Sequence, residues 1–165
     1  MAAAYARVDA EEAFDWLLAQ SVEAQRRSVS MVVSRLVDMS PEAALAQIER
    51  IDDHSRPALY RSAFSAWSRY DPDAANAFLG QIPTSERDPA INGMLQQTLF
   101  AGNVRSAERL FDRIVDEETR RQAATTMYMH LSRTDPDRAE RYRELSSMTI
   151  AEDGSITISL PAQGF

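Results

Sequence analysis

Cysteine and lysine are both absent from this chain of 165 residues, and histidine occurs only twice. Without cysteine there can be no disulfide, no zinc–thiolate site and no thiol catalysis. No apolar run reaches the roughly 18 residues that a membrane-spanning helix needs, so we expect no membrane insertion. Residues 1–5 also lack the charged start and long apolar stretch of a signal peptide.

Sequence motifs of enzymes are missing as well. The chain has no glycine-rich phosphate loop, no Gly-x-Ser-x-Gly elbow and no His-Glu-x-x-His pair. Met127 and His130 suggest a copper(I) site, but Met129 points elsewhere on a helix, and methionines at helical spacing are usually core. His54 follows two aspartates in an expected turn, where an exposed residue is the simpler interpretation. We therefore expect a non-enzymatic protein with no catalytic residue, cofactor or metal ligand.

The charge balance argues against nucleic acid as a partner. All 18 basic residues are arginine, the net charge is −7, and the longest basic runs are the pairs Arg26-Arg27 and Arg120-Arg121. A protein that follows a phosphate backbone needs a basic patch or stripe instead. At 44% hydrophobic residues, the chain has enough apolar material for the continuous core of one domain.

What the chain does contain is an internal repeat. The phrase Asp71-Pro72-Asp73-Ala74-Ala75 returns in related form at four other places, so that the copies start at residues 9, 40, 71, 103 and 135. The steps between them are 31, 31, 32 and 32 residues. A fixed period in this range is typical of a solenoid, in which one supersecondary unit stacks on copies of itself.

Each copy has the features of a helix start. An Asp, Ser or Asn can accept a hydrogen bond from a free amide of the first turn, proline often follows, and an acidic residue favours the positive end of the helix dipole. Apolar residues then recur at helical spacing, as at Leu79 and Ile82. Trp67 shares its place in the repeat with leucines and is expected in the core. Gly93 is expected either at a close helix contact or at a soft point in the stack, and Gly102 at a left-handed helix end.

These signals predict an all-α fold: a right-handed α-solenoid of four helical hairpins plus a capping helix, followed by a short C-terminal β-hairpin or tail. Residues 1–8 would be a leader, 9–147 the helical repeat domain, and 148–165 the hairpin or tail. The predicted helices cover residues 10–19, 22–38, 41–51, 55–70, 72–81, 86–101, 104–115, 117–133 and 136–147.

The C-terminal segment changes its period. Residues 149–151 and 155–160 alternate apolar and polar side chains about Asp153-Gly154, which indicates a hairpin with a tight turn. The strand edge near Ile156 and Ile158 can accept another strand, and self-pairing into a homodimer is its simplest use.

A pair of antiparallel helices that opens with Asp-Pro-x-x-Ala resembles the tetratricopeptide repeat and short bacterial helical-hairpin repeats. The resemblance covers residues 9–147, although the tetratricopeptide period is longer and its glycine and tyrosine positions have no consistent match here. It implies a scaffold that holds a peptide or another protein on a curved face, and it brings no catalytic residue.

The leading interpretation is therefore a non-enzymatic protein- or peptide-binding module. The alternative is a superhelical accessory domain of a larger bacterial envelope enzyme, such as a lytic transglycosylase. A bacterial periplasmic or membrane-anchored soluble domain is favoured over a cytoplasmic one, and the compartment stays open. The candidate binding residues occupy the variable position on the first helix of each pair and the C-terminal strand: Trp16, Gln47, Phe78, Tyr142, Ile156 and Ile158.

Overall fold

The computed structural model describes residue 12 and residues 22–146, 148–150 and 156–158. Within these ranges the fold is all-α, as predicted, with eight helices and a pair of very short strands. The helices are α3 (Val22–Met39), α4 (Pro41–Ile48), α5 (Arg56–Trp67), α6 (Pro72–Phe78), α7 (Thr84–Phe100), α8 (Val104–Phe111), α9 (Glu117–Leu131) and α10 (Pro136–Leu145). The first predicted helix, 10–19, lies outside the described residues except for Glu12.

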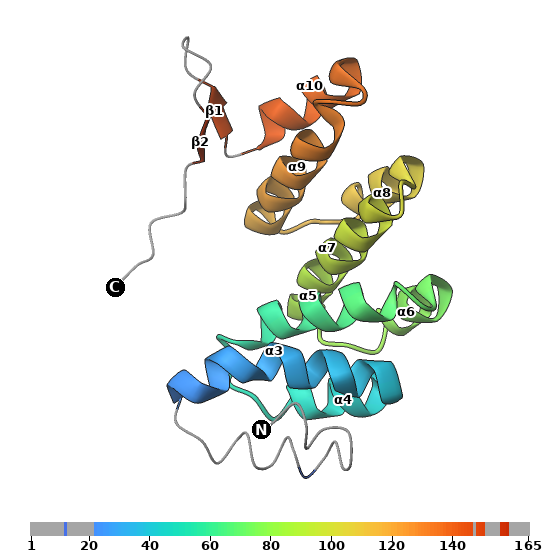
Figure 1. Cartoon of the computed structure of the whole chain (residues 1–165), viewed down its shortest axis with the longest axis vertical. Helices are drawn as coiled ribbons and strands as arrows, with labels where there is room; N and C mark the ends of the chain where they lie inside the picture. The colour runs from blue at the N-terminus through green and yellow to red at the C-terminus, as the bar shows by residue number, and fades with distance from the viewer. Residues whose placement is uncertain (1–11, 13–21, 147, 151–155, 159–165) are drawn as a thin grey trace.

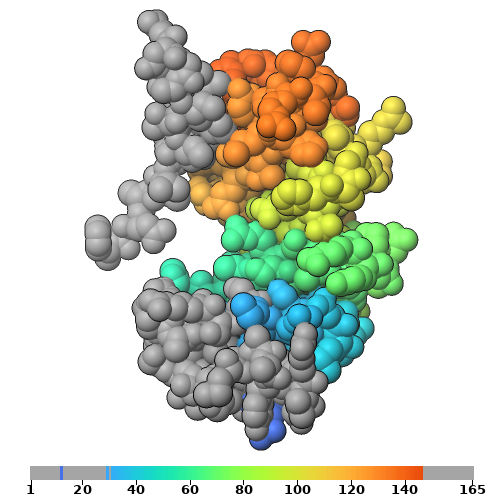
Figure 2. All heavy atoms as spheres, in the orientation of Figure 1, coloured from blue at the N-terminus to red at the C-terminus, as the bar shows by residue number. Residues whose placement is uncertain are grey.

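The helices succeed one another along the long axis of the molecule, from α3 and α4 at one end to α9 and α10 at the other (Figures 1 and 2). Their main packing contacts join helices that are adjacent or next but one in the chain, with α5 against α7 the most extensive. The longer helices α3, α5, α7 and α9 contact one another in sequence, and each shorter helix packs beside them. The hydrophobic core is correspondingly continuous from Val29 to Tyr142.

Side-chain caps explain why each shorter helix begins where it does. Ser40, Asp71, Asn103 and Asp135 each precede such a helix and accept a hydrogen bond from the backbone amide three residues on, at 3.4, 2.9, 3.2 and 3.2 Å. Proline follows three of these caps at a position where its missing N–H is no loss. The four helix starts predicted from the repeated phrase at 40, 71, 103 and 135 are thus confirmed.

A second local device joins each shorter helix to the longer one that follows. Arg56 Nε donates to the Ile51 carbonyl at 2.8 Å, and Arg120 Nη1 donates to the equivalent Ile114 carbonyl at the same distance. Arg87 makes the corresponding contact to Gly80, at 3.2 Å. These carbonyls lie at or just beyond helix ends, where backbone acceptors lack an intrahelical partner and a cation is favourable.

Two glycines and one tryptophan take the places expected from the sequence. Gly102 ends α7 with φ of 76°, the left-handed conformation that favours glycine. At Gly93, an added Cβ would lie 2.0 Å from the backbone oxygen of Arg61 in α5, so only glycine permits this approach of the two helices. Trp67 is 6% exposed, with its ring centroid 5.4 Å from that of Phe78.

After α10 the chain contains the short strands β1 (Met148–Ile150) and β2 (Ile156–Ile158). They pair antiparallel, with Met148 opposite Ile158 and Ile150 opposite Ile156. The predicted turn at Asp153-Gly154 lies outside the described residues. In the part of the chain that the structure describes, no helix combines the length and the apolar character needed to cross a membrane.

Candidate functional site

A groove of about 560 Å³ lies between α6 and α8. Asp73 and Asn76 of α6 form one wall. Ser106 and Arg109 of α8 form the other, together with Arg113 just beyond the end of α8. The second half of α7 contributes the base, where the buried side chain of Met94 lies beside the half-buried Gln97. The groove thus combines an apolar base with polar walls, as ligand sites commonly do.

Three arginines line this groove, and none of them forms an ion pair with a carboxylate of the described residues. Arg109 Nη2 donates to Ser106 Oγ at 2.8 Å, Arg113 Nη1 donates to Asn76 Oδ1 at 2.5 Å, and Arg69 lies against the Tyr70 ring. Among the described residues, no carboxylate lies within ion-pair distance of these three guanidinium groups. All three side chains are exposed, so their charge faces the groove and the solvent beside it.

Two exposed aromatic residues are adjacent in sequence to residues that line the groove. Tyr70 directly follows Arg69, and Phe100 directly precedes the lining residue Ala101. Their exposed fractions are 64% and 85%, which is unusual for side chains of this size. Exposed aromatic rings beside polar groups are common where proteins bind partners.

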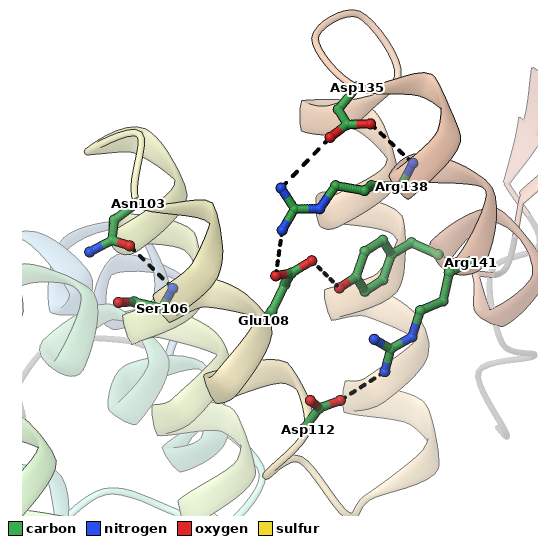
Figure 3. Close-up of polar contacts among 8 residues, drawn as sticks. Asn103, Ser106, Glu108, Asp112, Asp135, Arg138 and Arg141 are labelled. Carbon is green, nitrogen blue, oxygen red and sulfur yellow. Dashed lines mark hydrogen bonds and ion pairs between the residues drawn. The ribbon is translucent and has the colours of Figure 1, made fainter.

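The contact between α8 and α10 provides a comparison, because the same surfaces are closed there by ion pairs (Figure 3). Arg138 of α10 pairs with Glu108 of α8 at 2.6 Å, and Arg141 pairs with Asp112 at 2.9 Å. Glu108 also accepts a 3.4 Å hydrogen bond from the Tyr142 hydroxyl. The carboxylate hydrogen bond raises the pKa of Arg138 further. In this interface the arginines of α10 are therefore paired with Glu108 of α8 and with Asp112 at its end.

Tyr142 requires a correction to the sequence-based interpretation. It is only 1% exposed, with its ring edge-on to Phe111 at 5.1 Å between centroids. Burial, with Glu108 nearby, raises the pKa of Tyr142 to about 12. Because its ring completes the core between α8 and α10, Tyr142 is not offered to a partner at the surface.

The other candidate residues do not form a common surface among the described residues. Gln47 is half-buried and accepts from Arg50 at 2.6 Å. Phe78 is half-buried against Trp67. Trp16 lies outside the described residues, while Ile156 and Ile158 lie in β2.

A buried polar cluster lies between α5 and the start of α7. Glu86 is 6% exposed, and neither its Oε2 nor the Tyr60 hydroxyl has a hydrogen-bond partner among the described residues. Burial raises the pKa of Glu86, and the charge of Arg56 opposes this rise. Burial, together with the charges of Glu49 and Glu86, also raises the pKa of Tyr60 to about 12. The cluster is enclosed in the helix packing, so we treat it as a structural feature.

The residues considered for copper do not converge. Met127 is fully buried, whereas Met129 is 60% exposed two residues later on α9. His54 is exposed in the turn before α5. Nowhere in residue 12, 22–146, 148–150 or 156–158 do three or more His, Asp or Glu side chains gather so that they could hold a metal ion.

The fold and this groove define the molecule as an all-α protein with helical-repeat-like packing. Comparison with protein-family models, with curated proteins and with solved structures finds no match to the chain. Its function is therefore inferred from its own residues.

Sequence reasoning missed the groove. Its signal was nevertheless present, because aligned copies of the repeat differ in charge at equivalent positions. Glu108 of α8 and Asp112, which caps the end of α8, correspond to Asn76 and Gly80, each 32 residues earlier. A comparison of the charges on neighbouring copies, rather than of each helix alone, would have indicated arginines that lack acidic partners.

Proposed function

We propose that this protein is a non-enzymatic scaffold module that binds a peptide or protein segment in the groove between α6 and α8. We further propose that its helix pairs form a right-handed α-solenoid closed by α10. The observation that carries the functional proposal is the open groove between α6 and α8. The equivalent space between α8 and α10 is closed by ion pairs.

The groove walls suit an extended peptide. The exposed Asn76 and the half-buried Gln97 carry amide groups that can donate to and accept from a peptide backbone. Met94 and Leu110 supply an apolar base for a ligand side chain. Such a combination of apolar contact and backbone hydrogen bonds is how proteins hold extended peptides.

The test is a peptide-display selection on the purified chain, followed by a variant that fills the groove. Ala101 is an exposed lining residue, so Ala101→Trp should place an indole in the groove and abolish binding of the selected peptides. Ala58→Trp is the matched control, because Ala58 is exposed on α5 and does not line the groove. Selected peptides that bind Ala101→Trp as tightly as the unaltered chain would show that this groove is not the binding site.

A further inference from the structure

The repeat makes the two neighbouring interfaces directly comparable. Residues of α8 and α10 that are 32 apart occupy equivalent positions, so Arg141 corresponds to Arg109 and Tyr142 to Leu110. Arg109 therefore faces α6 from the position where Arg141 faces α8. In the α8–α10 interface, Arg141 has Asp112 as its partner at 2.9 Å.

The acids of that interface have no counterpart in α6. Glu108 is replaced there by the neutral Asn76, and Asp112 by Gly80, which has no side chain. Arg138 likewise has a neutral counterpart in Ser106, whose hydroxyl accepts a hydrogen bond from Arg109. Arg113 donates to the Asn76 amide oxygen. Asp73 is the one carboxylate among the residues that line the groove, against Arg69, Arg109 and Arg113. The groove is cationic on a molecule whose net charge is −7.

We propose that the ligand of this groove is an acidic peptide segment, whose carboxylates pair with Arg109 and Arg113 as Asp112 pairs with Arg141 in the next interface. This inference rests on the proposed function and adds the chemistry of the ligand. Arginine suits the role because its planar group binds a carboxylate through two parallel hydrogen bonds. The negative charge elsewhere on the protein repels acidic segments, so the cationic groove also directs where they bind.

The expected size of the effect follows from the exposure of the arginines. Exposed ion pairs are individually weak, so two or three together give about a tenfold difference in affinity. Partly exposed pairs are screened by salt, whose Debye length falls from about 10 Å at 0.1 M to about 3 Å at 1 M. Binding of the acidic ligand should therefore weaken as salt is added.

The first experiment measures fluorescence anisotropy with two labelled peptides, one of repeated Glu-Gly-Ser units and one of repeated Gln-Gly-Ser units. We expect the acidic peptide to bind the unaltered chain about tenfold more tightly at low salt, and to lose this advantage at high salt. Equal binding of the two peptides, or binding of neither, would overturn the proposal. Equal binding that Ala101→Trp abolishes would do so while leaving the proposed function intact.

The second experiment supplies the missing acids from within. Gly80 has open space where a Cβ would be, so Gly80→Asp is sterically allowed, and Asn76→Glu puts a carboxylate beside Arg113. The double variant should lose about tenfold in affinity for the acidic peptide, because its own carboxylates compete for the arginines. The matched control is Gly80→Ala with Asn76→Gln, which changes size without adding charge. The acidic double variant should bind the acidic peptide about tenfold more weakly than this control.

An unchanged affinity in the acidic double variant would show that the arginines of this groove do not hold the ligand carboxylates. A single-stranded RNA probe provides the last comparison. If the RNA binds more tightly than the acidic peptide, and the Ala101→Trp variant no longer binds it, the ligand is nucleic acid and the proposal is wrong.

Discussion

At Gly93 the backbones of α7 and α5 come together so closely that no side chain fits between them. We expect Gly93→Ala to lower the free energy of unfolding by about 1–3 kcal/mol, because the added Cβ meets a backbone carbonyl that cannot rotate away. Urea denaturation followed by circular dichroism measures this loss. Gly80→Ala is the control and should be neutral, since nothing lies within 4 Å of its added Cβ.

Glu86 should make the stability of the protein depend on pH. Burial raises the pKa of Glu86 above its value in the unfolded chain. Between the unfolded and the folded pKa, the folded state therefore binds more protons, so this residue makes stability fall as pH rises through that window. The groups around it are Arg56, Asp53, Ser85 and Tyr60.

The variant Glu86→Gln keeps the shape of the side chain and removes its titration. We expect its urea midpoint to exceed that of the unaltered chain at pH 7, and the difference to shrink as the pH approaches 4. A variant that is less stable than the unaltered chain at pH 7 would indicate that the charged carboxylate is stabilised by its surroundings.

How far the sequence predicts single residues depends on where their contacts come from. The core position of Trp67 followed from its place in the repeat. For Gly93, the cost of glycine inside a helix left a close contact or a soft point open, and the structure shows the close contact. Tyr142 was misassigned because helical spacing gives the direction of a side chain but not what lies opposite. Phe111 and Glu108 of another helix meet it there, and only the packed structure brings them together.

At the scale of the elements, the contact of Arg120 in α9 with the end of α8 can be tested by mutation. Arg120 donates to the carbonyls of Ile114 and Phe111, and its guanidinium lies 4.5 Å from the centre of the Phe111 ring. Arg120→Met retains most of the apolar stem but loses the donors. We expect a loss of about 1–2 kcal/mol in the free energy of unfolding, from charged hydrogen bonds that satisfy helix-end carbonyls.

Arg121→Met is the matched control for this variant. Arg121 is exposed, holds Glu117 and Glu118 only at 3.9 Å, and makes one long, exposed 3.4 Å hydrogen bond to the Glu117 carbonyl within its own helix. Its removal should therefore cost less than about 0.5 kcal/mol. Equal losses in the two variants would mean that the carbonyl contacts of Arg120 add nothing to stability.

Helix starts were predictable because a cap is a contact over three residues, and a short window of sequence contains all of it. Helix ends were placed too late in the shorter helices. Ile51, Ile82 and Ile114 extend the apolar spacing, and all three are buried, yet they lie in turns beyond the last helical residue. An apolar pattern reports burial, and burial continues through the turn after the helix has ended.

For the whole molecule, the C-terminal segment is predicted to mediate self-association. Strands β1 and β2 form a sheet of only two strands, so each has an outer edge that is unpaired within the described residues. Such an edge can add a strand from another copy through backbone hydrogen bonds. We expect the full chain to sediment as a dimer and a chain ending at Met148 to sediment as a folded monomer.

Circular dichroism of the shortened chain is the control for folding, because its helices should remain. If both chains sediment as monomers at high concentration, the segment does not join copies of this protein.

The all-α class followed from the period of the sequence, whereas the groove did not. It depends on the difference between two interfaces, each of which is built from helices 32 residues apart.

The local character of the helix caps has a consequence for how the chain folds. The side chains of Ser40, Asp71, Asn103 and Asp135 each bond an amide three residues away, and the main helix contacts join only near neighbours. Little loop entropy has to be lost before these contacts form, so folding should be fast for a chain of this length. Any helix pair can nucleate, and its neighbours then add to it in either direction. Slowing one pair by mutation should therefore shift the starting point of folding to another pair.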